Sequence, residues 1–240
     1  MQTNLFLNAR VSGEMISDEL REFLNKIGMI KTVEEDSFLF YEGDVAHEIY
    51  VIKKGLFQVS KLTPDGKELI LRICKKDDII GELTLFSDDP VYLLSAKALK
   101  PGEVYVIQKN KLETSLLENE QLSFEFMKWT HNHMRKFQSK IRDLLMNGKK
   151  GALYSTLIRL SNSYGVKKEN GVLIDLVLTN RQLAKFCAST RESVNRMLVQ
   201  LRRNNIIEND KMGRILIKDI QYLKDEIGCE DCPIEICNIN

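Results

Sequence analysis

Between Lys31 and Gln108 the chain consists of short segments rich in aromatic and β-branched residues, separated by glycine-containing turns. Such segments are typical of strands. The strongest turn, Pro64-Asp65-Gly66-Lys67, predicts a hairpin between two neighbouring strands. Many short strands at regular spacing predict an antiparallel sandwich or barrel, and we favour a β jelly roll. The expected strands are Phe38–Tyr41, Glu48–Ile52, Leu56–Leu62, Glu68–Cys74 and Val104–Ile107.

Helical patterns lie on both sides of this β domain. Within residues 1–30, a helix capped by Ser17 or Asp18 is expected, because apolar residues recur there at helical spacing. Its apolar residues are Leu20, Phe23, Leu24 and Ile27.

Residues 109–147 predict one long helix with a heptad of apolar residues along it. An apolar stripe on a long helix needs a partner. A second copy of the same helix is the simplest one, which predicts a parallel homodimer. The alternative is that the stripe packs back on its own β domain. The stripe consists of Met127, Thr130, Met134, Phe137, Ile141 and Leu144, with Phe126, Trp129 and His133 alongside.

Residues 148–222 have the pattern of a winged helix-turn-helix, a DNA-binding unit. Two capping boxes, Thr179-x-x-Gln182 and Ser189-x-x-Glu192, begin two helices joined by a tight turn. A hairpin wing over residues 206–218 follows them. Before them we expect a hinge at Gly148-Lys-Lys-Gly151, a helix over Ala152–Tyr164 and a strand over Gly171–Leu178.

The helix-turn-helix carries a local excess of positive charge, although the chain as a whole has a net charge of only +1. Such a patch could be an ordinary solvated helix face, but its position favours contact with DNA. The first turns of the second helix enter the major groove in this motif, which predicts base contacts from Arg191, Glu192, Asn195 and Arg196. We expect Lys185, Arg202 and Arg203 to contact the DNA backbone.

Three of the five cysteines, Cys229, Cys232 and Cys237, lie within nine residues in a C-x2-C-x4-C arrangement. Met1–Arg10 lacks the basic and apolar runs of a signal peptide, and no apolar run reaches membrane-spanning length. We therefore expect a cytoplasmic protein without a membrane partner, in which clustered cysteines bind a metal more readily than they form disulfides.

The cysteine spacing leaves the metal open. An iron–sulfur cluster is slightly favoured over a structural zinc, because Pro233 follows Cys232 as in many iron–sulfur segments. Three thiolates are one ligand short of a full set for either, and spacing does not choose the fourth. Cys74 and Cys187 fall inside expected core elements and are predicted to be buried apolar residues.

The order of jelly roll, long helix and winged helix-turn-helix resembles the Crp/Fnr family of bacterial transcription regulators. Gly81-Glu82-Leu83 and Arg191-Glu192-Ser-Val-Asn-Arg196 carry this resemblance, which covers nearly the whole chain. The C-terminal cysteines resemble those of the Bacillus-type Fnr branch, whose members hold a [4Fe-4S] cluster at this end. The resemblance implies an oxygen-responsive, homodimeric regulator of anaerobic gene expression that works with RNA polymerase and is not an enzyme.

The resemblance also assigns roles to single residues. In the Bacillus-type branch the fourth cluster ligand is an aspartate near the end of the dimer helix, and the matching residue here is Asp143. The Arg-Glu-x-x-x-Arg pattern at Arg191 implies palindromic DNA with TGTGA-like half-sites. Cyclic-nucleotide-binding members grip phosphate with an Arg-Ser pair, which Leu94-Ser95 replaces here, so cyclic AMP is not expected as the effector.

Two other functions are compatible with parts of this pattern. A Crp-like regulator could sense an unknown small ligand in the jelly roll, with a structural zinc on the C-terminal cysteines. A cupin-type metal oxygenase is disfavoured, because His47 is the only histidine in the β domain. The expected organisation is a helical segment (1–30), a jelly roll (31–108), a dimerisation helix (109–147), a winged helix-turn-helix (148–222) and a cluster-binding tail (223–240).

Overall fold

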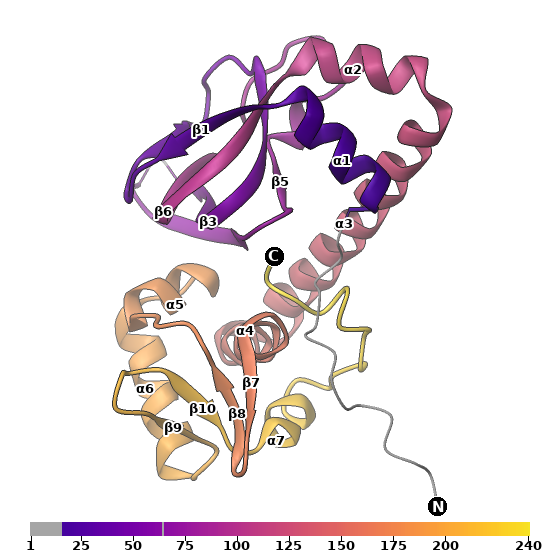
Figure 1. The fold of residues 1–240 in the computed structure, drawn as a ribbon. Helices are drawn as coiled ribbons and strands as arrows, with labels where there is room; N and C mark the ends of the chain where they lie inside the picture. Colours follow the sequence, from indigo (N-terminus) through magenta and orange to yellow (C-terminus); the bar gives the residue numbers. More distant parts are fainter. Residues whose placement is uncertain (1–15, 64) are drawn as a thin grey trace, which may run out of the picture.

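The computed structural model of the chain describes residues 16–63 and 65–240, and it comprises a β domain, a long helix and a C-terminal domain (Figure 1). The strands of the β domain pair antiparallel in the order β1-β6-β3-β4, with β2 added to β6 and β5 to β3. This confirms the expected antiparallel fold. The strands are β1 (Met29–Val33), β2 (Phe38–Phe40), β3 (Glu48–Leu62), β4 (Glu68–Cys74), β5 (Ile79–Ile80) and β6 (Ser95–Gln108).

Two of the expected strands, Glu48–Ile52 and Leu56–Leu62, are parts of the single strand β3. Gly55 has a φ of +106° and lies against the backbone of Gly102 on β6, so the strand bends there without ending. The prediction of a break at this glycine was wrong. The hairpin between β3 and β4 is confirmed, since Leu62 pairs with Glu68. Pro64 of the expected turn lies outside the described residues.

The helix before the β domain is confirmed as α1 (Asp18–Ile27), and the Ser17 hydroxyl caps it by accepting from the backbone N–H of Leu20 at 3.3 Å. The long helix after the β domain is two helices, α2 (Lys109–Glu118) and α3 (Glu120–Met146), which corrects the single helix expected over 109–147. Asn119 separates them, because its side chain accepts from the N–H of Leu122 at 3.0 Å and so begins a new helix.

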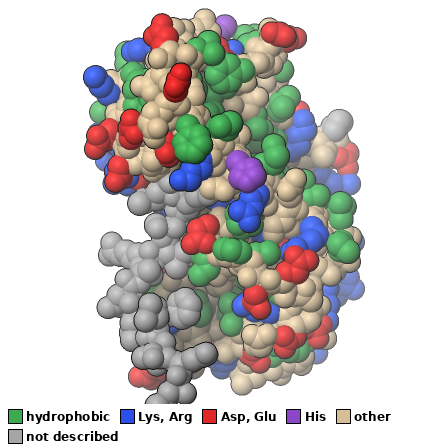
Figure 2. Space-filling view, turned by 90° about the vertical axis from the view of Figure 1, so that its right-hand side faces the viewer, with side chains coloured by type: hydrophobic (Ala, Val, Ile, Leu, Met, Phe, Trp, Pro, Cys, Tyr) green, Lys and Arg blue, Asp and Glu red, His purple; other side chains and the backbone are tan. Residues whose placement is uncertain are grey.

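Helix α3 has two different long faces. Leu122, Phe126 and Trp129 pack in a core with α1, whereas His133, Lys136, Lys140 and Asp143 continue the buried face toward the C-terminal domain. The opposite face carries the heptad stripe. Met127 is 62%, Met134 57% and Ile141 52% exposed, while Thr130, Phe137 and Leu144 are partly buried. Met127, Met134 and Ile141 are therefore left in solvent, whereas Phe137 lines a cavity together with Phe40 and Val59 of the β domain. Hydrophobic side chains lie among charged ones on the face of the molecule that Figure 2 shows.

The C-terminal domain has the expected winged helix-turn-helix with two corrections before it. Helix α4 begins at Gly148, not at Ala152, and Gly148 itself forms the corner after α3 with a φ of +57°. The strand expected over Gly171–Leu178 ends at Ile174. The elements are α4 (Gly148–Tyr164), β7 (Gly165–Lys168), β8 (Gly171–Ile174), α5 (Asn180–Phe186), α6 (Arg191–Arg203), β9 (Ile207–Asn209), β10 (Ile215–Ile217) and α7 (Ile220–Asp225).

The β domain and the C-terminal domain share one hydrophobic core. Leu56, Ile70 and Ile73 of β3 and β4 belong to the same buried cluster as Leu157 of α4 and Phe186 of α5. A common core fixes how the two domains are placed relative to each other. No helix within residues 16–63 and 65–240 has the length and apolar character needed to span a membrane.

Lys140 of α3 lies at the junction of these domains. Its ammonium donates to the carbonyl oxygens of Ile70 at 3.3 Å and Leu71 at 2.7 Å on β4, and it lies 5.4 Å from the ring centre of Phe186. Burial lowers the pKa of Lys140 to about 7, and the neighbouring Arg159 adds to this effect. The junction therefore holds a lysine that loses its proton near neutral pH.

Lys140 makes the stability of the fold depend on pH. Its folded pKa lies below the unfolded value of about 10.4, so the unfolded chain binds one more proton between these values and stability rises with pH above 7. In urea unfolding at pH 7 and pH 9, the wild type should gain about 2 kcal/mol more than Lys140→Met over this interval. Lys128→Met, at an exposed position of α3, is the control and should follow the wild type.

Candidate cluster site and nucleic-acid interface

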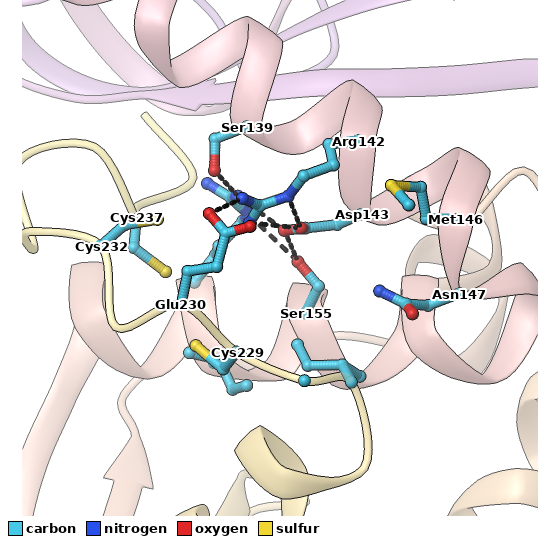
Figure 3. Close-up of a pocket in the computed structure, with 14 residues that line it drawn as sticks. Ser139, Arg142, Asp143, Met146, Asn147, Ser155, Cys229, Glu230, Cys232 and Cys237 are labelled. Carbon is cyan, nitrogen blue, oxygen red and sulfur yellow. Dashed lines mark hydrogen bonds and ion pairs between the residues drawn. The ribbon is translucent and has the colours of Figure 1, made fainter.

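A cavity of about 120 Å³ lies where α3, α4 and the C-terminal tail meet, and the predicted cluster ligands line it. Asp143 comes from α3, and Cys229, Cys232 and Cys237 come from the tail. Figure 3 shows the three cysteines on the tail to one side of the cavity, with Asp143 and Ser155 across from them. Residues more than eighty positions apart in the sequence thus share one site.

The Asp143 carboxylate is buried and fully engaged. Its Oδ2 accepts from the Arg159 guanidinium at 2.7 Å and from the Ser155 hydroxyl at 2.6 Å. Its Oδ1 accepts from Arg142 at 3.0 Å. Burial by itself would raise the pKa of Asp143, but the hydrogen bonds from Ser155 and Arg159 outweigh it and lower the pKa. The carboxylate is therefore negatively charged and held in a fixed orientation.

Arg159 of α4 ties the tail to this site. It is only 1% exposed, and besides Asp143 it donates to the Ser139 hydroxyl of α3 at 2.9 Å and to the carbonyl of Ile236 at 3.1 Å. Asn162, one turn further along α4, donates to the carbonyl of Cys237 at 2.6 Å. Sequence reasoning missed both residues, because their partners are distant in the chain.

The donor atoms around the cavity fit an iron–sulfur cluster or a zinc ion in kind, since three thiols and one carboxylate face it. In the part of the chain that the structure describes, no three His, Cys, Asp or Glu side chains lie close enough together to hold a metal ion as they stand. Burial raises the pKa of the Cys237 thiol, and the positive charge of Arg159 opposes this only in part. Cys74 and Cys187 are buried elsewhere, as expected.

The recognition helix α6 begins one residue later than the second capping box predicted. Thr190 is the N-cap and accepts from the N–H of Ser193 at 3.2 Å, whereas the buried hydroxyl of Ser189 has no hydrogen-bond partner. The Ser189 box was therefore wrong. The first box is confirmed, because Thr179 and Gln182 cap each other at the start of α5.

The predicted base-reading residues lie on the exposed face of α6. Arg191, Glu192, Asn195 and Arg196 are all exposed within its first two turns. The Asn195 side-chain oxygen accepts from the Asn180 amide of α5 at 3.0 Å, which fixes the direction of its own amide group. These residues form a continuous polar surface of the kind that meets base edges.

The residues expected to contact phosphates are placed differently from one another. Arg203 is exposed at the end of α6, and Arg202 donates to Asn209 of β9 at 3.0 Å. Lys185 of α5 forms an ion pair with Glu68 of the β domain, so it does not face solvent freely.

Comparison with known proteins is consistent with this architecture. Residues 30–119 match the family model of a cyclic nucleotide-binding domain, and residues 151–226 match that of a Crp-like helix-turn-helix domain. The chain is 58% identical over 236 residues to the anaerobic regulatory protein of Bacillus subtilis, covering 98% of this chain and 99% of that relative. The chain belongs to the Crp/Fnr family.

Two further kinds of comparison, with another curated relative and with solved structures, give lower identities. The lactate racemization regulatory protein of Lactiplantibacillus plantarum is 32% identical over 201 residues, covering 80% of this chain and 88% of that protein. Among solved structures, a CooA mutant from Carboxydothermus hydrogenoformans matches with a TM-score of 0.75 over 91% of this chain and 98% of that chain, at 18% identity. FixK2 from Bradyrhizobium japonicum gives 0.70 over 83% and 96%, also at 18% identity. These structures confirm the fold, and the family match makes the chain a DNA-binding transcription regulator.

The β domain of this Crp/Fnr protein contains a small cavity of about 30 Å³, with mostly apolar walls that include Leu94. Its one buried cation there, Arg72, donates to Glu82 at 3.1 Å and to the carbonyl of Ile79 at 2.6 Å. A phosphate would have to take this guanidinium from Glu82. The cavity thus supports the expectation that cyclic AMP is not the effector.

The Arg159–Asp143 pair should dominate the stability of the junction between α3, α4 and the tail. Arg159→Met leaves the Asp143 carboxylate buried without its main partner and should lower the free energy of unfolding by about 3–5 kcal/mol. Arg142→Met removes a cation from the other carboxylate oxygen, but that arginine is partly exposed, and the loss should stay below about 1 kcal/mol. Urea denaturation compares the two variants, and equal losses would contradict the central role of Arg159.

Proposed function

We propose that this protein is a homodimeric transcription regulator of anaerobic gene expression that senses oxygen through a [4Fe-4S] cluster. Cys229, Cys232, Cys237 and Asp143 would hold the cluster. The observation that carries the proposal is that these four residues line one cavity at the junction of α3, α4 and the tail. The 58% identical relative in Bacillus subtilis is described as an anaerobic regulatory protein, which supports a role in gene regulation when oxygen is absent.

The residues around the cavity would play different roles in holding such a cluster. The three thiols supply soft sulfur ligands, and Asp143 supplies a harder oxygen ligand that matches iron less well. When bound, a cluster of this kind supplies a redox-active centre that oxygen destroys. Arg159 holds one oxygen of Asp143, whereas the partly exposed Arg142 holds the other and is the partner that can give way.

The same residues connect the site to the DNA-binding unit. Arg159 and Asn162 of α4 already bond to the tail backbone at Ile236 and Cys237. Drawing the cysteines toward Asp143 would pull the tail onto α3 and fix α4, which leads into the helix-turn-helix. Loss of the cluster would release this restraint.

The DNA-bound form would be a dimer. The exposed stripe of Met127, Met134 and Ile141 along α3 is suited to a second copy of the helix. Two α6 helices would then enter successive major grooves of a palindrome with TGTGA-like half-sites. Bound at such a site, the regulator would engage RNA polymerase. Such a protein would act in the cytoplasm, where the chromosome lies.

The first test is anaerobic purification followed by iron, sulfide and zinc analysis and an absorbance spectrum before and after exposure to air. The proposal expects about four irons and four sulfides per chain and a brown colour that bleaches in air. Cys237→Ser should lose this iron, whereas Cys74→Ala, at a buried cysteine away from the cavity, should keep it. One zinc per chain without iron would overturn the oxygen sensor and favour a structural zinc in the tail.

Base reading by Glu192 gives a separate prediction. A carboxylate among DNA phosphates is unfavourable unless it accepts from a base such as the cytosine amine. Glu192→Ala should therefore relax discrimination at one base pair of each half-site by about 1–3 kcal/mol, measured by selection from a randomised duplex library. Glu169→Ala, at an exposed position between β7 and β8, is the control. If Glu192→Ala leaves the discrimination between base pairs unchanged, Glu192 does not read a base.

A further inference from the structure

One of the residues expected to contact DNA phosphates already forms an ion pair with a carboxylate of the same chain. Lys185, in the last turn of α5, pairs with Glu68 at the start of β4. The Lys185 side chain is 29% exposed and the Glu68 side chain 22%, so the pair is partly shielded from solvent. Glu68 is itself held in place, since it accepts from Gln58 at 2.5 Å and from Ser60 at 2.8 Å.

The reading end of α6 faces the same part of the β domain. A cleft of about 760 Å³ has the β3–β4 hairpin on one side, with Thr63 and Gly66 to Leu69. Its other side is formed by the turn before α6 and by the first residues of that helix, from Ala188 to Glu192. An α6 helix seated in a major groove has DNA backbone beside its first turns. The hairpin therefore lies across the cleft from the end of α6 beside which this backbone would run.

We propose that the β3–β4 hairpin inhibits DNA binding within the chain, because Glu68 competes with DNA phosphate for Lys185 and the hairpin stands beside the reading end of α6. In this arrangement Glu68 neutralises the charge of the Lys185 ammonium, so that a phosphate gains less from contacting it. DNA binding then requires the helix-turn-helix to move off the hairpin. The proposal rests on the family's DNA-binding activity and not on any metal in the tail.

One feature of the structure stabilises the closed arrangement, and another provides a position at which it can open. The hairpin strand β4 contributes Ile70 and Ile73 to the core that it shares with the C-terminal domain, so the closed arrangement is a packed one. Gly148, with a φ of +57°, joins α3 to α4 at a sharp corner. Small backbone changes at such a corner would carry the whole helix-turn-helix away from β4.

The charged side chains at the hairpin tip pair with each other, except for Glu68. Asp65 pairs with Lys67 at 2.5 Å, which leaves Glu68 as the acid that binds the helix-turn-helix. Removing this one charge should therefore weaken the inhibition without disturbing the turn. Glu68→Gln keeps an acceptor for Gln58 and Ser60 and removes the partner of Lys185.

The test measures the Kd of the full chain for a mixed-sequence DNA duplex by fluorescence anisotropy. A phosphate contact does not depend on base sequence, so this probe works even if the half-site proposal is wrong. Glu68→Gln should bind roughly threefold or more tightly than the wild type. Glu103→Gln removes the same charge from a β-domain acid that pairs with Lys53 and Lys54 instead, and it should change the Kd less.

A double-mutant cycle decides whether Lys185 is the contested group. In a Lys185→Ala background, Glu68→Gln should no longer tighten binding, because the competition has already been removed. A gain that persists in this background, or one that Glu103→Gln matches, would overturn the proposal.

Hydrogen–deuterium exchange on the unmodified protein gives a measurement that needs no variant. Duplex binding should speed exchange over the hairpin residues 66–69, because they lose their cover, while it slows exchange at the start of α6. Protection of both segments by DNA would show that the hairpin belongs to the DNA-binding surface, which would contradict an inhibitory role.

Discussion

The buried guanidinium of Arg159 holds together three segments that nothing else joins so directly. It donates to Asp143 and Ser139 of α3, to Ser155 of its own helix and to the carbonyl of Ile236 in the tail. A charge taken out of water is tolerated only when it is paired and its donors are used, and here both conditions are met. This side chain therefore contributes directly to the placement of α4, and with it of the helix-turn-helix.

Strand β4 is the second structural constraint on the C-terminal domain. Along one strand, Glu68 binds α5, the carbonyls of Ile70 and Leu71 accept from Lys140 of α3, and the N–H of Ile73 donates to the carbonyl of Ile239 in the tail at 3.2 Å. The tail and the helix-turn-helix therefore contact the same rigid element. A change in the cysteine segment can reach the DNA-binding surface through β4 as well as through α4.

How much could be predicted from the sequence varied with the range of the interaction. The Thr179 box, the cap of α1 and the β3–β4 hairpin depend on residues within a few positions of each other. The box and the hairpin were predicted correctly, and of the two candidate caps, Ser17 and Asp18, the structure uses Ser17. The choice of Thr190 over Ser189 was missed, because both are good caps and only tertiary packing buries the Ser189 hydroxyl.

The candidate cluster site shows the same limit. The cysteine spacing marked the tail as a site, but Asp143 came from family resemblance, since spacing cannot select a ligand about ninety residues away. Arg159 gave no signal at all, because its partners outside its own helix lie on α3 and in the tail, which only the fold brings together. The break at Asn119 was hidden for another reason. The segments on both sides of it are helical, and an asparagine cap interrupts them only locally.

The C-terminal half of α3 buries polar side chains and exposes apolar ones, which is the reverse of the usual distribution. It buries His133, Lys136, Lys140 and Asp143 against its own chain, while Met134 and Ile141 lie open to solvent. A helix built this way gains little from the hydrophobic effect within one chain, because its apolar side chains stay in water. Its order is then set by whatever covers that face. In the proposed dimer, folding of this segment and assembly would therefore be one process, and the proposed cluster site at Asp143 would be completed only together with it.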